Sequence, residues 1–216
     1  MNVSEALAKR KSIRAFSEKN VDTDLIRSLL EKAARSPSGG NVQPWRIYVL
    51  CGSTILDFKK FLATQTEPES PEYPIYPNTL SEPYRSSRFK VGEDMYKLLG
   101  IPREDKKARF ARLMENYNFF GAPAAFFCFV DRQMGPPQWS DLGMFLQSFM
   151  LLATEQGLGT CAQEAWSMRP KSVSDFVSAP QELMLFCGMA IGYPEETVIN
   201  TLTTDRTPLD DFATFV

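Results

Sequence analysis

Residues 36–45 read Ser-Pro-Ser-Gly-Gly-Asn-Val-Gln-Pro-Trp and join a helical pattern to an apolar strand pattern. The stretch supplies consecutive small residues with free backbone amides, and it ends on Trp45, a side chain that a solvated linker does not need. Because glycine has no side chain, a loop of this composition lets the backbone lie against a flat ligand. The alternative is an ordinary helix-to-strand connection with a Pro/Gly turn. Taken alone, the stretch leaves both interpretations open.

The composition is that of an ordinary globular protein, with 216 residues and a formal net charge of −2. A chain of this length can bury a substantial core, and we expect a single domain over 1–216. The small net charge gives no reason to expect a nucleic acid or a membrane surface as partner. Residues 1–10 lack the apolar core of a signal peptide, and the apolar run 119–130 is too short to span a bilayer. These features predict a cytoplasmic protein.

The chain contains no histidine, which excludes Ser-His-Asp and Cys-His catalysis and any metal site built on histidine. The cysteines are scattered without a close pair, so we expect no metal, and we expect Cys51, Cys128 and Cys187 to be small buried hydrophobes. Cys161 lies in a glycine-rich segment and is harder to assign. An enzyme without histidine needs carboxylates, a lysine, a tyrosine or a bound cofactor. A cofactor is attractive because it brings its own reactive atoms.

Hydrophobic periodicity predicts the main elements. Helices are expected over 2–9, 22–35, 54–64, 91–99, 104–118 and 139–156, and strands over 45–51, 123–130 and 182–191. The strand 123–130 is almost continuously apolar and should be buried on both faces. The helix 139–156 is apolar round most of its circumference, which predicts a central, buried helix. Strands separated by helices indicate a sheet flanked by helices within one domain.

Two segments do not follow this pattern. Residues 65–88 are rich in proline, serine and glutamate with interspersed tyrosines, so they are either a flexible insertion or a lid over a ligand. The aromatic candidates for the walls of a pocket are Tyr73, Tyr76, Tyr84 and Phe119. Residues 200–216 are polar and then carry Leu209, Phe212 and Phe215, a composition that suits an arm wrapped around another subunit.

Three short motifs carry candidate chemistry. Residues 10–14 read Arg-Lys-Ser-Ile-Arg, and the guanidinium groups of Arg10 and Arg14 match phosphate oxygens in geometry, although a solvated basic turn is the simpler reading. Residues 203–206 add two hydroxyl groups and Arg206 near the other end of the chain. Residues 157–159 read Gly-Leu-Gly, but they end a helix instead of opening one, which disfavours a Rossmann dinucleotide site.

The order of these motifs is more specific than any one of them. The chain carries R-x-S-x-R at 10–14, S-P-S-G-G-N-x-Q-P-W at 36–45, G-L-G-T at 157–160, Q-E-A-W at 163–166, G-Y-P at 192–194 and R-x-P-L-D at 206–210. This series resembles the FMN-dependent nitroreductase family from Arg10 to Phe212. The resemblance implies an α+β fold, a three-layer sandwich with a mostly antiparallel central sheet flanked by helices. It also implies an intertwined homodimer with FMN at the subunit interface and the arm 200–216 over the partner.

The resemblance also implies roles for individual residues. Arg10 and Ser12, with Lys11 in the same segment, and Arg206 would hold the phosphate, while Arg14 would reach the pyrimidine edge of the flavin. Pro37, Ser38 and Gly39 would approach the ring from the other subunit, supported by Asn41 and Gln43. The backbone amides of Gln163, Glu164 and Ala165 would face flavin N5 and O4. Two positions depart from the family pattern: Ala165 replaces a common glycine, and Thr204 stands where some members carry lysine.

The activity implied by the resemblance is a ping-pong reduction with no catalytic side chain, because the chemistry occurs at flavin N5. NADH or NADPH would supply hydride, and a small planar aromatic acceptor such as a nitroaromatic or a quinone would then be reduced. Reductive dehalogenation or enone reduction on the same fold is an alternative. A flavin-binding protein without turnover is another.

Overall fold

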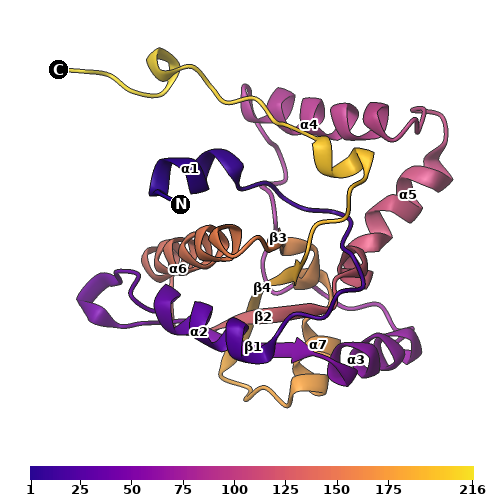
Figure 1. Cartoon of the computed structure of the whole chain (residues 1–216), viewed down its shortest axis with the longest axis vertical. Helices are drawn as coiled ribbons and strands as arrows, with labels where there is room; N and C mark the ends of the chain where they lie inside the picture. The colour runs from indigo at the N-terminus through magenta and orange to yellow at the C-terminus, as the bar shows by residue number, and fades with distance from the viewer.

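A four-stranded sheet lies at the centre of the fold. The computed structural model describes residues 1–216. The strands are β1 (Arg46–Cys51), β2 (Ala124–Asp131), β3 (Gly159–Gln163) and β4 (Leu183–Gly192), in the spatial order β1-β2-β4-β3 (Figure 1). Every neighbouring pair is antiparallel. The predicted antiparallel sheet is therefore confirmed.

The chain also forms seven α-helices. They are α1 (Val3–Lys9), α2 (Thr23–Ala33), α3 (Ser53–Thr64), α4 (Tyr84–Leu98), α5 (Lys106–Met114), α6 (Pro136–Glu155) and α7 (Pro170–Val177). Helices α2 and α6 cover one face of the sheet, and α3 and α7 cover the other. Helices α4 and α5 lie outside these three layers (Figure 1).

Alternation along β2 builds the two cores. Phe126 points to the α2–α6 side, where its ring lies 5.0 Å from that of Phe149, while Phe127 points to the α3–α7 side, 5.2 Å from Phe58. All residues of β2 except the last are buried, as predicted from the continuous apolar run. Two buried faces on one strand require a helical layer on each side, so the predicted α+β three-layer sandwich is confirmed.

The exposed helices begin and end away from the predicted positions. Helix α4 begins at Tyr84, seven residues before the predicted start, and it buries none of its residues, so no apolar periodicity marked it. Helix α5 ends at Met114, and the chain continues as 3₁₀ turns over Glu115–Gly121. Phe119 lies in these turns with φ of 52° and no exposed surface, packed on Phe58 and Trp166. The prediction that Phe119 forms a pocket wall is therefore wrong, because its ring belongs to the core.

Two elements were not predicted from the sequence. Strand β3 has only five residues and follows the turn at Gly157, and its pairing with β4 identifies it as a strand. Helix α7 begins at Pro170, which suits the first helical position because proline lacks the amide hydrogen that this position leaves unpaired.

Helix α6 is buried along one side only. Leu142, Phe145 and Phe149 face the sheet, whereas Met144 on the opposite side keeps 39 % of its surface exposed. The predicted central, buried helix is therefore only partly buried within one chain. An exposed apolar side on a long helix is typical of a surface that another subunit covers.

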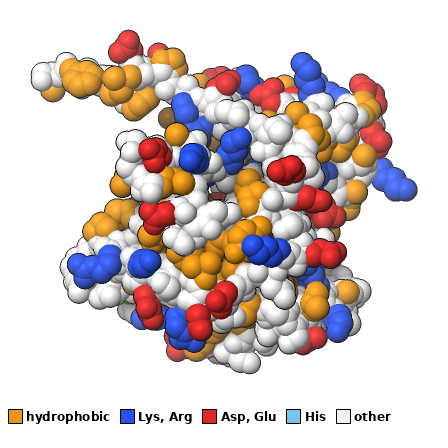
Figure 2. Space-filling view, in the orientation of Figure 1, with side chains coloured by type: hydrophobic (Ala, Val, Ile, Leu, Met, Phe, Trp, Pro, Cys, Tyr) orange, Lys and Arg blue, Asp and Glu red, His pale blue; other side chains and the backbone are white.

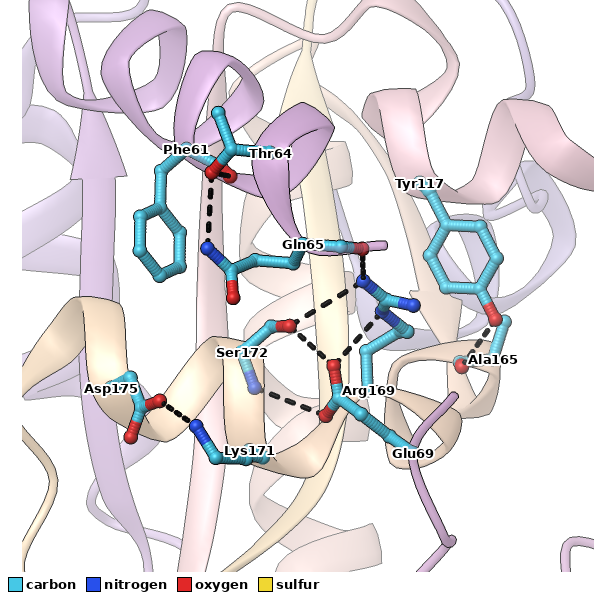
Figure 3. Close-up of polar contacts among 10 residues, drawn as sticks. All are labelled: Phe61, Thr64, Gln65, Glu69, Tyr117, Ala165, Arg169, Lys171, Ser172 and Asp175. Carbon is cyan, nitrogen blue, oxygen red and sulfur yellow. Dashed lines mark hydrogen bonds and ion pairs between the residues drawn. The ribbon is translucent and has the colours of Figure 1, made fainter. Parts of the chain in front are cut away.

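Residues 65–73, which we call the strap, contact α7 and β4, and Gln65 and Glu69 of the strap lie beside Arg169 and Ser172 (Figure 3). Arg169 Nη2 donates a 2.6 Å hydrogen bond to the carbonyl of Gln65, and Arg169 Nε lies 3.1 Å from the carboxylate of Glu69. That carboxylate also accepts a 3.0 Å hydrogen bond from the backbone amide of Ser172. The start of the 65–88 segment is thus held by charged and backbone hydrogen bonds.

The end of the strap covers the edge of β4 that β3 leaves free. Strand β3 pairs only with the last part of β4, from Gly188 onward. The carboxylate of Glu72 accepts a 3.1 Å hydrogen bond from the backbone amide of Leu185, and the hydroxyl of Tyr73 donates to the carbonyl of Phe186. Side chains of the strap therefore satisfy polar groups at an otherwise unpaired edge.

The C-terminal segment leaves the body of the protein and ends in solvent (Figure 1). Phe212 and Phe215 keep 69 % and 85 % of their surface exposed, and hydrophobic side chains cover much of the projecting tail (Figure 2). None of the helices combines the length and the hydropathy that crossing a lipid bilayer requires.

Candidate functional site

The basic segment 10–14 is fixed along the outer edge of β3. The backbone amide of Ile13 donates a 2.9 Å hydrogen bond to the carbonyl of Thr160, and Ser12 forms a parallel bridge with the same residue. A Cβ atom on Gly159 would stand 2.6 Å from Cγ1 of Ile13, so only glycine at this position allows so close an approach. Because β3 runs on to Gln163, this contact places the basic segment near the turn that follows.

Asn200 holds the C-terminal segment against the same region. Its Oδ1 accepts a 2.8 Å hydrogen bond from the amide of Arg14, and its Nδ2 donates 2.8 Å hydrogen bonds to the carbonyls of Ala15 and Glu195. These three bonds bring residues 203–206 beside residues 10–14. Sequence reasoning missed Asn200, because a lone asparagine in a polar tail has no pattern that distinguishes it.

Residues from the two ends of the chain surround one hollow of about 300 Å³, which we call the basic hollow. Its polar lining consists of Arg10, Lys11, Ser12, Arg14, Thr203, Thr204 and Arg206. Arg206 Nη1 donates a 2.7 Å hydrogen bond to the hydroxyl of Thr204. Four cations and three hydroxyl groups line the hollow and no carboxylate does, which is the donor set that an anion such as phosphate requires.

Arg14 also lines a second hollow of about 250 Å³, which we call the inner hollow. One wall is the predicted turn of Gln163, Glu164 and Ala165, at the end of β3. The other wall consists of residues that sequence reasoning did not select: Met95, Tyr96, Arg112, Leu113, Asn116 and Phe120. The structure therefore brings three predicted motifs, at 10–14, 163–165 and 203–206, to two hollows that share Arg14.

The turn 163–165 is fixed by side chains from two directions. Gln163 is buried, its Nε2 donates a 2.8 Å hydrogen bond to the carbonyl of Asn116, and its Oε1 accepts from Trp166 Nε1 at 3.3 Å. The hydroxyl of Tyr117 donates a 3.2 Å hydrogen bond to the carbonyl of Ala165 (Figure 3). The Gln163 side chain is thus engaged inside the protein, and the turn 163–165 lines the inner hollow.

Arg112 is the charged residue of the inner hollow that the sequence did not reveal. Its Nη2 donates a 3.0 Å hydrogen bond to the carbonyl of Arg14, and its guanidinium carbon lies 5.0 Å from the centre of the Phe120 ring. Partial burial lowers the pKa of Arg112, and the neighbouring charge of Arg14 lowers this pKa further.

The loop 36–45 lies away from both hollows in the single chain. The amide of Gly39 contacts the buried carboxylate of Asp141 at 3.3 Å, and the hydroxyl of Ser38 accepts a 3.0 Å hydrogen bond from the amide of Gln43. Pro37 lines a separate hollow between α1 and α6, and Asn41 has a φ of 57°. The structure thus does not bring Pro37, Ser38, Gly39 or Asn41 to the basic segment of their own chain. A role at the flavin of a partner subunit stays a prediction.

The three candidate tyrosines do not line either hollow. Tyr73 packs on Trp139 and Phe186 with ring centres 5.5 and 6.1 Å away, and burial raises the pKa of its hydroxyl. Tyr76 and Tyr84 are exposed on the surface. The aromatic side chains of the inner hollow are instead Tyr96 and Phe120.

The fold and the two hollows define an α+β protein that can hold an elongated ligand with an anionic end. The family model described as Nitroreductase family matches residues 7–193. The nitrobenzene nitroreductase of Ectopseudomonas oleovorans is 31% identical over 219 residues, covering 99% of this chain and 96% of that protein. The 4-nitrobenzoate reductase of Pseudomonas putida is 31% identical over 212 residues, covering 97% of this chain and 93% of that protein.

A solved structure gives the same result at higher identity. The FMN and NADPH-dependent nitroreductase NfnB from Sphigopyxis sp. strain HMH is 42% identical and superposes with a TM-score of 0.95 over 100% of this chain and 99% of that chain. The chain therefore belongs to the nitroreductase family.

Proposed function

We propose that this chain is an NAD(P)H-dependent oxidoreductase that holds the phosphate of FMN in the basic hollow and the flavin ring in the inner hollow, and that it reduces nitroaromatic compounds. The observation that carries the proposal is the lining of the basic hollow, four cations and three hydroxyl groups without a carboxylate, together with Arg14, which also lines the inner hollow. The named relatives and the FMN-dependent neighbour described above support the same cofactor and acceptor class.

The phosphate is bound by residues from opposite ends of the chain. Arg10 and Arg206 each present a planar guanidinium that can make two parallel hydrogen bonds to phosphate oxygens. Ser12 adds a neutral donor, and Lys11 adds a further positive charge to the same hollow. Because Thr204 replaces the lysine of some family members, more of the phosphate binding depends on Arg10 and Arg206.

The flavin ring is oriented by Arg14 and by the turn 163–165. Arg14, at the junction of the two hollows, is placed to stabilise negative charge at the pyrimidine edge of the ring. The backbone amides of Gln163, Glu164 and Ala165, which line the inner hollow, would hold the edge of the ring that carries N5 and O4. When bound, FMN supplies the atom that accepts hydride from NADH or NADPH and passes the electrons to the acceptor. No histidine is needed for this chemistry, and the chain has none.

The complete site is proposed to form between two copies of the chain. Pro37, Ser38, Gly39 and Asn41, which lie away from the hollows of their own chain, would reach the flavin of the partner. The exposed side of α6 and the exposed Phe212 and Phe215 offer apolar surface for this homodimer. A reductase that draws on NAD(P)H has its donor in the cytoplasm, so we infer residence there.

The acceptor is proposed to be a small planar nitroaromatic compound, in line with the nitrobenzene and 4-nitrobenzoate reductases to which the chain is similar. Quinones share the flat, electron-poor ring and belong to the same acceptor class. The apolar part of the inner hollow, with Met95, Leu113 and Phe120, suits stacking of such rings.

The test is anaerobic stopped-flow reduction of the purified protein. We expect a yellow protein whose flavin absorbance is bleached by NADH or NADPH and restored by nitrobenzene or 4-nitrobenzoate. Halophenols and enones serve as comparison acceptors for the alternative activities. A colourless protein that does not take up added FMN would contradict the proposal. Bound flavin that NAD(P)H reduces no faster than free FMN would indicate a binding protein instead.

A further inference from the structure

Arg112 occupies an unusual position for a charged side chain. It lies on α5, is only partly exposed, and lines the inner hollow together with Arg14. Its Nη2 donates to the carbonyl of Arg14 at 3.0 Å, whereas its Nε is buried with no hydrogen-bond partner. One face of the guanidinium packs toward the ring of Phe120. Arg112 therefore keeps unused hydrogen-bonding capacity at the boundary of the hollow.

The charge of Arg112 is not neutralised by an acidic side chain. Glu115 attracts it at longer range, but the carboxylate of Glu115 accepts a hydrogen bond from Asn118 instead, at 3.2 Å. Glu164 is the carboxylate that lines the inner hollow, and it makes no ion pair. Burial and the charge of Arg14 both lower the pKa of Arg112. Desolvation of a cation and its repulsion from a second cation both cost free energy. An anionic group of a ligand in this hollow would offset both costs for Arg112 and Arg14.

The position of Arg112 indicates which part of the ligand it serves. The phosphate end has its own lining in the basic hollow, which Arg112 does not reach. Arg112 lies on the inner side of Arg14, with the turn 163–165 in the same hollow. If FMN binds as in the proposed function, on which this inference rests, the group beside Arg112 is the flavin ring. Reduction of that ring adds negative charge at the pyrimidine edge.

We propose that Arg112 is a positioning residue that holds the backbone of Arg14 in place and adds a second positive charge to the inner hollow, so that this site binds reduced FMN more tightly than oxidised FMN. Preferential binding of the reduced form raises the reduction potential of the bound flavin. The simpler role would be structural, with Arg112 only fastening α5 to the N-terminal segment. The two roles differ in one respect: a fastening residue affects both forms of the cofactor equally.

The experiment compares wild type with R112Q and R112M, which remove the charge, and R112K, which keeps it. K107Q is the matched control, because Lys107 is an exposed cation on the same helix and outside the hollow. The dissociation constants for oxidised and for reduced FMN are measured anaerobically, together with the midpoint potential of the bound flavin. Thermal unfolding of each protein without FMN reports on folding.

We expect R112Q to weaken the binding of reduced FMN about tenfold more than that of oxidised FMN, which for a two-electron couple lowers the midpoint potential by about 30 mV. R112M should show the same loss, and it provides the test where R112Q does not fold, because methionine packs readily against an aromatic ring. R112K should recover at least half of the lost midpoint potential, and K107Q should have the midpoint potential and the FMN affinities of wild type.

The inference would be overturned if R112Q and R112M weakened the binding of oxidised and of reduced FMN equally. It would also be overturned if the midpoint potential of R112K were as low as that of R112Q. Either result leaves the proposed function intact as long as wild type binds FMN and is reduced by NAD(P)H. Failure of wild type to bind FMN would instead contradict the proposed function itself.

Discussion

At the residue scale, the basic hollow depends on two arginines that are almost the whole chain apart in sequence. Arg10 follows α1, and Arg206 lies in the irregular C-terminal segment. Each motif alone was compatible with a solvated basic turn. Asn200, through its hydrogen bonds to Arg14 and Ala15, holds the C-terminal segment against the N-terminal one, so that both motifs line one basic hollow.

We predict that Arg10→Ala and Arg206→Ala each weaken FMN binding about 10- to 100-fold. A hydrogen bond to a charged group contributes about 1.5–3 kcal/mol, and each substitution removes such bonds to the phosphate. The measurement is a fluorescence titration of the FMN-free protein at two salt concentrations. Arg27→Ala, an exposed arginine on α2, is the control and should leave the affinity unchanged. Unchanged affinity in both hollow variants would exclude them from the phosphate site.

At the element scale, the strap changes the interpretation of residues 65–88. The sequence left a flexible insertion and a lid equally open. Residues 65–73 are bound to Arg169, Ser172 and β4, whereas residues 81–90 are all exposed. We therefore propose that any movement over the inner hollow involves the chain beyond Tyr73 and helix α4, which contributes Met95 and Tyr96 to that hollow.

We predict that Glu69→Ala lowers the free energy of unfolding by about 3 kcal/mol, because it leaves the partly buried Arg169 without its ion pair and removes the acceptor of the Ser172 amide. Urea unfolding measures this loss, and hydrogen exchange shows whether residues 65–73 lose protection. Glu67→Ala is the control on the same segment, since Glu67 is exposed. A Glu69→Ala protein as stable as wild type would show that the strap is not held by this network.

The elements differ in how far the sequence revealed them, and burial explains the difference. The strands β2 and β4 bury nearly every residue, so their apolar runs were visible, and Asp22 marked the start of α2 by capping it. Helix α4 buries nothing and β3 is short, so neither has a hydrophobic pattern of its own. Local periodicity records contact with the core, and elements that are held by other contacts do not show it.

At the scale of the whole molecule, several apolar surfaces stay exposed in the single chain. Phe212 and Phe215 are largely exposed, and the outer side of α6 keeps Met144 accessible. The loop 36–41 carries the family motif but lies outside the two hollows of its own chain. All three observations have the same explanation if a second copy of the chain covers these surfaces and receives the loop.

We predict that truncation after Thr207, which keeps Arg206 but removes Leu209, Phe212 and Phe215, raises the dissociation constant of the dimer at least about 100-fold. Burying a large apolar side chain contributes about 1.5–3 kcal/mol, so loss of two phenylalanines costs about 3 kcal/mol or more. Analytical ultracentrifugation measures the dimer, and a parallel titration measures FMN binding, which should weaken with it. Asp211→Asn is the control within the tail. A truncated protein that dimerises like wild type would show that the tail does not contact the partner.

From the sequence by itself, the buried strands predicted a sheet flanked by helices, and the ordered motifs, through the family that they resemble, implied FMN and an antiparallel sheet, because residue order and local periodicity can be read without coordinates. The sequence also identified Arg10, Arg14, Gln163 and Arg206 one by one. Only the tertiary structure decided that these residues line two hollows that meet at Arg14, since their proximity depends on Gly159, Asn200 and the pairing of β3. Only the tertiary structure revealed Arg112, whose importance comes from its neighbours. A single residue in a chain does not specify the charges that folding places around it.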